Sequence, residues 1–254
     1  MPRIIAVLNQ KGGVGKTTTT VNVGAFLAKQ GKRVLLIDLD PQGNATSGLG
    51  FDKQGLTQTT YSLLLESEPA NNVRRATSVK NMDMLPTNSD LSGAEVQLAG
   101  VTERELKLRT AIHDIVHEYD IVLIDCPPSL GLLTVNALAA STDVLIPVQT
   151  EYYAMEGLSQ LIQTIQRVQQ GLNQSLSILG VVMTMYDSRT SLSEQVRAEI
   201  TRVFGELVFS TVIPRNVRLA EAPSHGLPVM EYDKWSKGSR AYKALTKEVM
   251  HRVG

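Results

Sequence analysis

Residues 3–18 read RIIAVLNQKGGVGKTT, and this stretch decides the fold. Residues 3–9 form an apolar run that is typical of a buried strand. A glycine-rich turn follows, and apolar residues then recur at helical spacing over 16–30, until Gly31 ends the pattern. A strand, a glycine-rich turn and a helix that begins with Gly-Lys-Thr are the context of a phosphate-binding loop.

The residue types in this turn suit phosphate chemistry. Glycines let backbone N–H groups curve around phosphate oxygens, and the start of a helix adds partial positive charge. We expect Lys16 on the β- and γ-phosphates of ATP and the Thr17 hydroxyl on Mg²⁺. The residues expected to hold the nucleotide are Gly12, Gly13, Val14, Gly15, Lys16, Thr17 and Thr18. Gln10 stands where the usual motif has its first glycine, so the alternative is a tight turn that binds nothing.

Short apolar runs alternate with longer amphipathic stretches along the chain. Strands are expected at residues 33–38, 82–85, 120–125, 143–148, 178–185 and 208–213. Helices are expected at residues 102–118, 155–170, 191–204 and 239–252. This alternation predicts an α/β fold with a mostly parallel, doubly wound β-sheet flanked by helices on both faces. We expect one domain over residues 1–254, with residues 42–60 as loops and one short helix.

Composition narrows the class of protein. The chain has 254 residues, of which 43% are hydrophobic and 20% charged, as in ordinary globular domains. The formal net charge is zero, so overall attraction to nucleic acid or to an anionic membrane is not indicated. The single cysteine, Cys126, excludes an intrachain disulfide and argues against an iron–sulfur cluster. We see no signal peptide and no membrane-spanning run, and therefore expect a cytoplasmic protein.

Three aspartates close apolar strands. Asp38 and Asp40 follow the second strand, and Asp125 ends the run at 120–125. Ligands of parallel sheets bind beyond the carboxyl ends of the strands, where these residues emerge. Carboxylates there can support Mg²⁺ or orient a water that attacks the γ-phosphate. The alternative for each aspartate is a helix cap.

Several segments resemble the ParA/MinD family. KGGVGKTT at 11–18 is similar to its deviant Walker A motif, DLDPQGN at 38–44 to switch I, and DCPPS at 125–129 to Walker B and switch II. The resemblance runs from residue 4 to about residue 228 and is closest to small chromosomal ParA proteins of the Soj type. Further segments that carry it are QTEYYAMEGLS at 149–159, TMYDSRT at 184–190 and IPRNVRLAEAPSHG at 213–226.

The resemblance implies roles for particular residues. It implies that Lys11 crosses a dimer interface to touch the partner's nucleotide, and that Asp40 supports hydrolysis. It assigns Asp38 and Asp125 to the metal, together with Thr17. Adenine contacts are implied for Pro214 and Asn216, and DNA contacts for Arg189 and Arg218. Cys126 lies within the Walker B segment, and we assign it no chemistry.

As a function, the resemblance implies an ATP-dependent homodimer that binds double-stranded DNA without sequence preference and segregates chromosomes or plasmids with a ParB-like partner. Such a protein associates with the nucleoid when ATP is bound. We expect no N-terminal helix-turn-helix extension, and we expect residues 239–254 to pack on the sheet rather than bind a membrane. The alternatives are a cargo-positioning ATPase, a MinD-like membrane switch, or a metabolic P-loop kinase or ligase.

Overall fold

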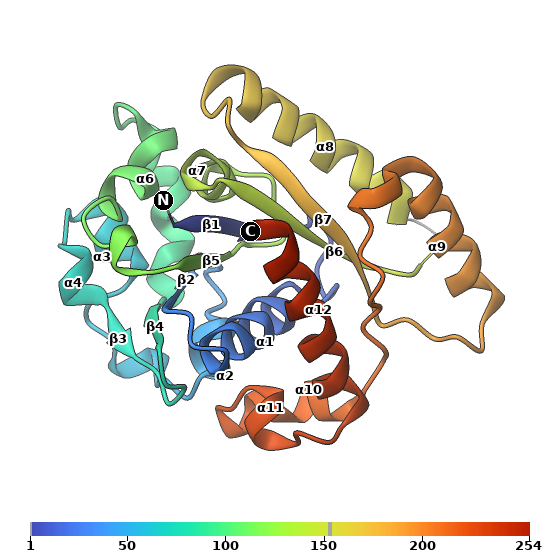
Figure 1. The fold of residues 1–254 in the computed structure, drawn as a ribbon. Helices are drawn as coiled ribbons and strands as arrows, with labels where there is room; N and C mark the ends of the chain where they lie inside the picture. Colours follow the sequence, from blue (N-terminus) through green and yellow to red (C-terminus); the bar gives the residue numbers. More distant parts are fainter. Residues whose placement is uncertain (1, 152–153) are drawn as a thin grey trace.

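The computed structural model describes residues 2–151 and 154–254, in which one sheet carries the fold (Figure 1). Its strands lie in the order β3-β4-β2-β5-β1-β6-β7. The parallel strands are β1 (Arg3–Val7), β2 (Val34–Asp38), β4 (Met82–Leu85), β5 (Ile121–Asp125), β6 (Asp143–Gln149) and β7 (Ser177–Thr184). The short β3 (Arg75–Ala76) pairs antiparallel with β4 at the edge. The predicted parallel α/β sheet is therefore confirmed.

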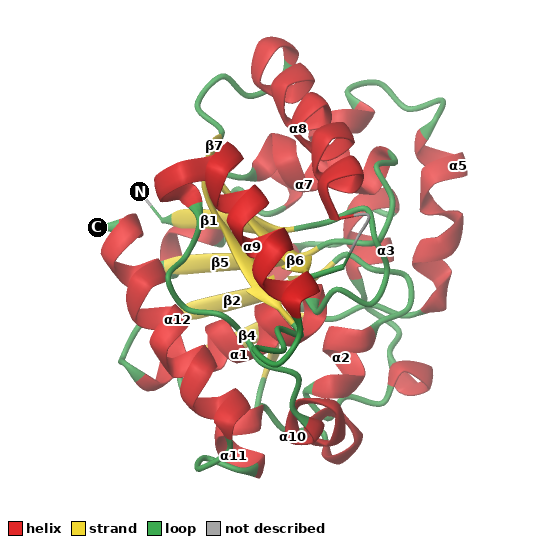
Figure 2. Ribbon diagram, turned by 90° about the vertical axis from the view of Figure 1, so that its right-hand side faces the viewer, coloured by secondary structure: helices red, strands yellow, loops and turns green. Residues whose placement is uncertain are grey.

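Alternate residues of the central strands face opposite layers, because side chains of a strand alternate between its two sides. Ile5 and Val7 belong to one core, and Ala6 and Leu8 belong to the other. The layer on the Ile5 side contains α1 (Lys16–Lys29), α2 (Asn44–Gly48), α10 (Val217–Glu221), α11 (Val229–Tyr232) and α12 (Lys237–Val253). The layer on the Ala6 side contains α3 (Thr60–Leu65), α4 (Ala70–Val73), α5 (Ala94–Leu98), α6 (Lys107–Ala111), α7 (Leu132–Ala140), α8 (Ala154–Gly171) and α9 (Ser191–Phe204). Both layers can be followed in Figures 1 and 2.

Short 3₁₀ turns connect these elements. They lie at Lys53–Gly55, Ser89–Gly93, Arg104–Leu106, Val116–Glu118, Gly205–Leu207 and Ala222–His225. Residues 42–60 are loops around α2, as expected. The segment 149–159 that carries part of the family resemblance includes Tyr152 and Tyr153, which lie outside the described residues.

The predicted strand at 208–213 is wrong. Val208 forms an isolated bridge with Val181, and the Phe209 and Ile213 N–H groups donate to carbonyls of β7, but this pairing is not continuous. The N–H groups of Ser210 and Thr211 donate instead to the Glu248 carboxylate of α12, at 2.8 and 2.9 Å. These N–H groups are thus satisfied by a side chain, and no further strand is added at this edge.

The predicted single helix at 102–118 is broken into two 3₁₀ turns and the short α6. Asn136 of α7 accepts from the Leu108 N–H at 3.0 Å and donates to the Arg104 carbonyl at 2.8 Å. Backbone groups that would join one continuous helix are therefore paired with α7, a partner distant in sequence.

The C-terminal helix α12 lies along α1 and packs on the sheet (Figure 1). Its apolar face consists of Tyr242, Leu245 and Val249, which are all buried in the core. The Tyr242 hydroxyl also lies 3.1 Å from the Thr19 hydroxyl of α1. The expectation that this face covers the sheet is confirmed. Within residues 2–151 and 154–254, no helix has the length and apolar character required to cross a bilayer.

Candidate phosphate-binding site

The loop between β1 and α1 has the backbone shape that its glycines predict. Gly13 has φ +74° and Gly15 has φ +86°, a left-handed conformation that residues with a Cβ rarely adopt. The first hydrogen bond of the helix runs from the Thr19 N–H to the Gly15 carbonyl, at 2.9 Å. The N–H groups that precede Thr19 therefore lie at the open start of α1, where an anion is favoured by hydrogen bonds and by the helix dipole.

Two side chains hold this loop against the sheet. Asn9 donates to the Pro147 carbonyl at 2.8 Å and accepts from the Lys11 N–H at 3.0 Å. The Thr184 hydroxyl at the end of β7 donates to the Val14 carbonyl at 2.8 Å, and Val14 itself is buried. The loop is thus fixed on both sides before any ligand binds, which reduces the ordering cost of binding.

Lys16 folds back over the loop. Its ammonium donates to the Lys11 carbonyl at 3.1 Å, and only 6% of the residue is exposed. Burial lowers the pKa of Lys16, while the nearby charge of Asp125 opposes this effect. The charged form of a buried ammonium is stabilised by an anionic partner such as a phosphate.

Lys11 behaves differently from Lys16. Its ammonium forms an ion pair with Glu151, and both side chains are about half exposed, at 43% and 44%. The lysine therefore stands at the surface of the loop instead of within it. This position is open to a group on a second molecule, if the Glu151 contact is exchanged.

Asp38 and Asp125 lie side by side, because β2 and β5 pair in register at these residues. Asp125 accepts from the Thr17 hydroxyl at 2.7 Å and from the Thr20 hydroxyl at 3.0 Å. Asp38 accepts from the N–H and the hydroxyl of Thr46, at 2.8 and 2.7 Å. Both carboxyls are buried, and burial raises the pKa of each; the charge of Asp38 adds to the rise at Asp125.

Asp40 lies two residues beyond Asp38 on the same edge. It is 6% exposed and accepts from the Gln42 N–H at 3.0 Å, which shapes the turn after β2. The predicted metal residues, Thr17, Asp38 and Asp125, offer hydroxyl and carboxylate oxygens, which are the donors that Mg²⁺ prefers. No group of three or more His, Cys, Asp or Glu that would hold a metal alone occurs in the described part of the chain. These residues therefore fit a Mg²⁺ ion that takes its other ligands from phosphates and water.

Replacing Asp125 by Asn should stabilise the nucleotide-free protein while impairing its chemistry. With the pKa raised on folding, the folded state binds protons more tightly than the unfolded state, so stability falls as pH rises from about 4 towards the raised value. An Asn at position 125 carries no charge, so the Asp125→Asn variant avoids this loss of stability at high pH. Its unfolding midpoint should be higher by roughly 2–4 °C at pH 7.5, with a smaller gain at pH 5.5. Mg²⁺-dependent ATP hydrolysis should fall at least about tenfold.

Thermal unfolding at both pH values measures this effect, and Asp114→Asn is the control. The Asp114 side chain is 94% exposed, so its amide variant should leave the midpoint unchanged at both pH values. A midpoint lowered by Asp125→Asn at pH 7.5 would contradict the argument.

A hollow of about 330 Å³ adjoins the loop. It is lined by Thr17, Thr18, Val21 and Asn22 of α1, by residues of α2, and by residues between 219 and 227. Neither Pro214 nor Asn216 lines it, although the 219–227 segment follows them directly. The Asn216 side-chain oxygen is buried without a hydrogen-bond partner. Such an oxygen can still accept a hydrogen bond, but the adenine contact of both residues remains a prediction.

Arg189 and Arg218 lie on the surface and are both paired with carboxylates. Arg189 follows β7, is 87% exposed at its side chain, and binds Asp187 through two nitrogens at 2.9 and 2.7 Å. Arg218 of α10 contacts Glu221 at 2.8 Å and Asp233 at 3.4 Å. A phosphate that binds either arginine has to compete with these intramolecular partners.

Several residues that shape the site were not predicted from the sequence. Thr20 lies on the same face of α1 as Lys16 and Thr17, and helical spacing is a signal that could have revealed it. Thr46 lies in α2, eight residues after Asp38, and Thr184 reaches the loop from the distant β7. Thr46 also accepts from the Thr87 N–H at 3.0 Å, and so connects Asp38 to the end of β4.

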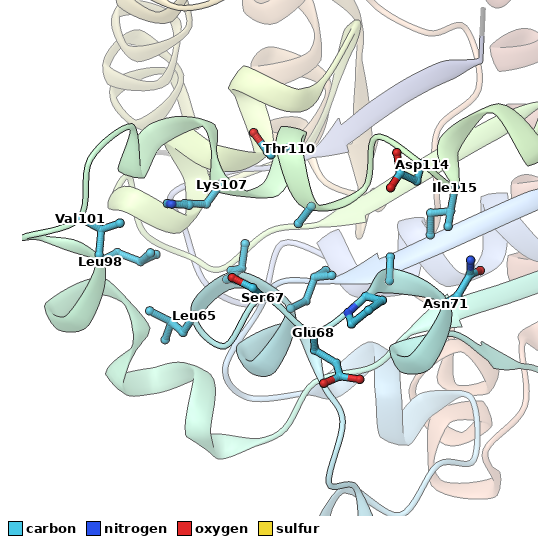
Figure 3. Close-up of a pocket in the computed structure, with 15 residues that line it drawn as sticks. Leu65, Ser67, Glu68, Asn71, Leu98, Val101, Lys107, Thr110, Asp114 and Ile115 are labelled. Atoms are coloured by element: carbon cyan, nitrogen blue, oxygen red, sulfur yellow. The ribbon is translucent and has the colours of Figure 1, made fainter.

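A separate hollow of about 410 Å³ lies between residues 63–71 and 98–115 (Figure 3). Its walls combine apolar side chains, such as Leu65 and Leu98, with polar ones, such as Glu68, Lys107 and Asp114. None of the predicted site residues lines it. It is therefore not a part of the phosphate-binding site.

The parallel sheet and the loop at its carboxyl edge define the chain as a P-loop NTPase. Its sequence matches the family described as an AAA domain over residues 2–178. It is 55% identical over 249 residues to the sporulation initiation inhibitor protein Soj of Bacillus subtilis, covering 98% of each chain. It is 52% identical over 254 residues to the chromosome-partitioning ATPase Soj of Treponema pallidum, covering 100% of this chain and 99% of the relative. The chain belongs to the AAA domain family and, within it, to the Soj/ParA family of chromosome-partitioning ATPases, so the resemblance seen in its motifs is confirmed.

A solved structure is also similar over the whole chain. The cobyrinic acid a,c-diamide synthase of Mycobacterium smegmatis, with a bound ATP analog and magnesium, superposes with a TM-score of 0.90. It is 40% identical, and the match covers 100% of this chain and 96% of that one.

Proposed function

We propose that this chain is a Mg²⁺-dependent ATPase whose ATP-bound dimer holds double-stranded DNA without sequence preference and partitions chromosomes or plasmids. The observation that carries the proposal is that the two lysines of one loop occupy different positions. Lys16 is buried over the loop, and Lys11 stands at its surface in an exchangeable ion pair. Relatives named as partitioning ATPases, and a similar structure with an ATP analog and magnesium, support it.

ATP binds with its phosphates at the start of α1. The N–H groups of the loop and the Lys16 ammonium contact the phosphate oxygens, and little reorganisation is needed because the loop is already fixed. Thr17, Asp125 and Asp38 would hold Mg²⁺, which neutralises charge on the phosphates when bound. Asp40, on the same edge, positions the attacking water.

Dimerisation follows from the position of Lys11. In the single subunit its ammonium pairs with Glu151. Across a face-to-face dimer it exchanges this carboxylate for the phosphates of the partner's ATP, a more highly charged ligand. Loss of the γ-phosphate weakens that contact, so hydrolysis opens the dimer and acts as a timer.

The dimer then binds DNA through Arg189 and Arg218, each present twice. Contacts to phosphates release counterions whatever the base sequence, which suits retention without sequence preference. A ParB-like partner stimulates slow hydrolysis and releases the dimer from the DNA. Because only the ATP-bound dimer holds DNA in this cycle, the ATP-bound form is concentrated on the nucleoid until hydrolysis.

The Arg189→Ala variant should lose DNA retention while keeping ATP hydrolysis. Removing one phosphate contact from each subunit should weaken DNA binding at least about tenfold at 0.1 M salt and reduce the salt slope by roughly two. Salt titrations of DNA binding with ATP present measure both quantities. Arg202→Ala is a matched control, because the Arg202 side chain is 78% exposed and its ion pair with Glu199 is long, at 4.0 Å. Unchanged retention in Arg189→Ala would remove this residue from the DNA surface.

A second candidate function, a metabolic ligase, is favoured by the name of the Mycobacterium smegmatis relative. A ligase needs a substrate site beside the γ-phosphate, and turnover that depends on that substrate. Cobyrinic acid should raise ATP turnover strongly if this function holds, whereas DNA and a ParB-like protein should raise it under our proposal. Cargo positioning by the same DNA-bound cycle differs only in the partner, and pull-down from the native organism separates the two. A MinD-like membrane switch would require ATP-dependent binding to lipid vesicles.

A further inference from the structure

A third hollow, of about 710 Å³, lies on the outer face of the layer that contains α1 and α12. Its apolar lining comes from Phe26 of α1, Met230 of α11 and Trp235 in the turn before α12. Phe26 and Met230 are 7% and 8% exposed and form the floor, while Trp235 is 75% exposed. An exposed tryptophan beside an apolar floor leaves a large non-polar surface in water, which is typical of an interaction site.

Basic side chains surround this hollow. They are Lys29, Lys234, Arg240, Lys243 and Lys247. We call the hollow with its three apolar and five basic residues the cationic groove. Arg240, Lys243 and Lys247 follow each other at helical spacing and form one stripe along α12. Lys29 lies in the last turn of α1, and Lys234 lies 5.1 Å from the centre of the Trp235 ring.

These charges lack acidic partners within residues 2–151 and 154–254, since none of the five basic residues takes part in an ion pair there. Two carboxylates of the neighbouring segments, those of Asp233 and Glu248, are engaged elsewhere, and Glu231 of α11 does not line the hollow. The Asp233 carboxylate contacts Arg218. It also accepts a hydrogen bond from the Trp235 backbone N–H at 3.1 Å. Glu248 accepts from the Ser210 and Thr211 N–H groups. The groove thus presents uncompensated positive charge around an apolar floor.

We propose that the cationic groove binds an acidic segment of a partner protein, with a bulky apolar side chain seated on Phe26, Met230 and Trp235. The carboxylates of the segment would pair with the basic rim. A volume of about 710 Å³ is sufficient for one or two large side chains. An amphipathic helix in a groove, anchored by apolar residues at i, i+3 and i+7, is a common form of such recognition.

Duplex DNA fits the groove less well than such a peptide. The outside of the duplex is a continuous row of phosphates and offers no apolar group for a recessed floor. The contacts of DNA would therefore end at the lysines, leaving Phe26, Met230 and the exposed Trp235 uncovered. An acidic peptide with an apolar anchor uses the charge and the floor together.

The groove is remote from the nucleotide. It adjoins the end of α1, whereas the phosphate loop adjoins its start; a helix of 14 residues spans about 21 Å. A bound segment therefore leaves the nucleotide site open. The surface offers a means of tethering the ATPase to a partner in either nucleotide state.

The chain itself supplies a probe, because Trp235 is its single tryptophan. The test uses synthetic helical peptides of about 14 residues with Glu or Asp on one face and Leu or Phe at i, i+3 and i+7. Binding should shift the Trp235 emission to shorter wavelength in a saturable way. Peptides with Ala in place of the apolar residues, or Lys in place of the acidic ones, should bind at least about tenfold more weakly.

Variants then assign the site, using dye-labelled peptide so that the readout does not need tryptophan. Trp235→Ala, and the pair Lys243→Gln with Lys247→Gln, should each weaken peptide binding at least about tenfold. The pair Lys80→Gln with Arg109→Gln removes the same charge outside the groove and should have little effect. ATP hydrolysis and DNA retention of Trp235→Ala should stay within about twofold of the wild type, since this residue contacts neither site in our proposal.

Three results would overturn the proposal. The first is that no peptide of the series shifts the Trp235 emission. The second is that peptides without apolar residues bind equally well, which would leave only non-specific charge attraction. The third is that a short DNA duplex shifts the emission and that Trp235→Ala loses DNA retention, which would make the groove part of the DNA surface.

Discussion

The Lys16→Ala variant is expected to lose ATP hydrolysis by at least about a hundredfold, the largest effect of any single substitution considered. Lys16 is 6% exposed, and its ammonium lies over the loop, bonded to the Lys11 carbonyl at 3.1 Å. Burial lowers the pKa of Lys16, because its charge lacks a full anionic partner. The phosphates of ATP should therefore form strong charge-assisted hydrogen bonds with this ammonium. Alanine removes that contact in the ground state and in the transition state.

Steady-state phosphate release and nucleotide binding measure this loss together. Nucleotide affinity should fall as well, because the ammonium contacts the phosphates before any bond breaks. The unfolding midpoint should change little, since none of the ion pairs in the described part of the chain involves Lys16 and no carboxylate therefore loses a direct partner. Lys80→Ala, an exposed lysine remote from the site, is the control. Turnover within about threefold of the wild type would show that Lys16 is not the phosphate-binding lysine.

The Lys11→Ala variant should separate binding from assembly. It removes the surface lysine that pairs with Glu151 but leaves Lys16 and the loop N–H groups in place. We therefore expect ATP affinity within about threefold of the wild type, yet at least about a tenfold loss of ATP-dependent dimer. DNA retention should fall in parallel, because only the dimer doubles the phosphate contacts.

Light scattering with ATP, ADP or no nucleotide measures the dimer directly. Glu151→Gln is the informative companion variant, since it frees Lys11 from its intramolecular partner and should keep or strengthen the dimer. A Lys11→Ala protein that dimerises with ATP as the wild type does would exclude a role for Lys11 across the interface.

The sequence predicts the conformation of the loop between β1 and α1 well because its features are local. Gly13, Gly15, Lys16 and Thr17 lie within a few residues, and their conformations follow from residue type and from the start of one helix. The buried strands are also predictable, because they are continuous apolar runs in a sheet covered on both faces.

The remainder of the site depends on strand order, which a single sequence does not reveal. Asp38 and Asp125 are neighbours only because β5 lies between β1 and β2. Thr184 reaches the loop from the distant β7, and the contact of Thr46 with Asp38 depends on how the chain turns between β2 and α2.

The two incorrect elements have the same origin. At 208–213 and at 102–118, side chains from α12 and α7 take the backbone groups that local periodicity assigns to a strand or a helix. Tertiary hydrogen bonds there override local preference. The carboxylate partners of Arg189 and Arg218 were not predicted either, although Asp187 and Glu221 are close in sequence. Proximity alone does not show that a surface charge is paired.

The central claim is that ATP, through the dimer, gates binding to DNA, and one co-sedimentation experiment tests it most directly. Wild type, Lys11→Ala and Asp40→Ala are sedimented with double-stranded DNA in ATP, in ADP and without nucleotide. We predict that wild type binds only with ATP, that Lys11→Ala fails to bind, and that Asp40→Ala binds as well or better because its ATP persists. Equal sedimentation of the wild type in ATP and ADP, or no sedimentation in any state, would contradict the claim.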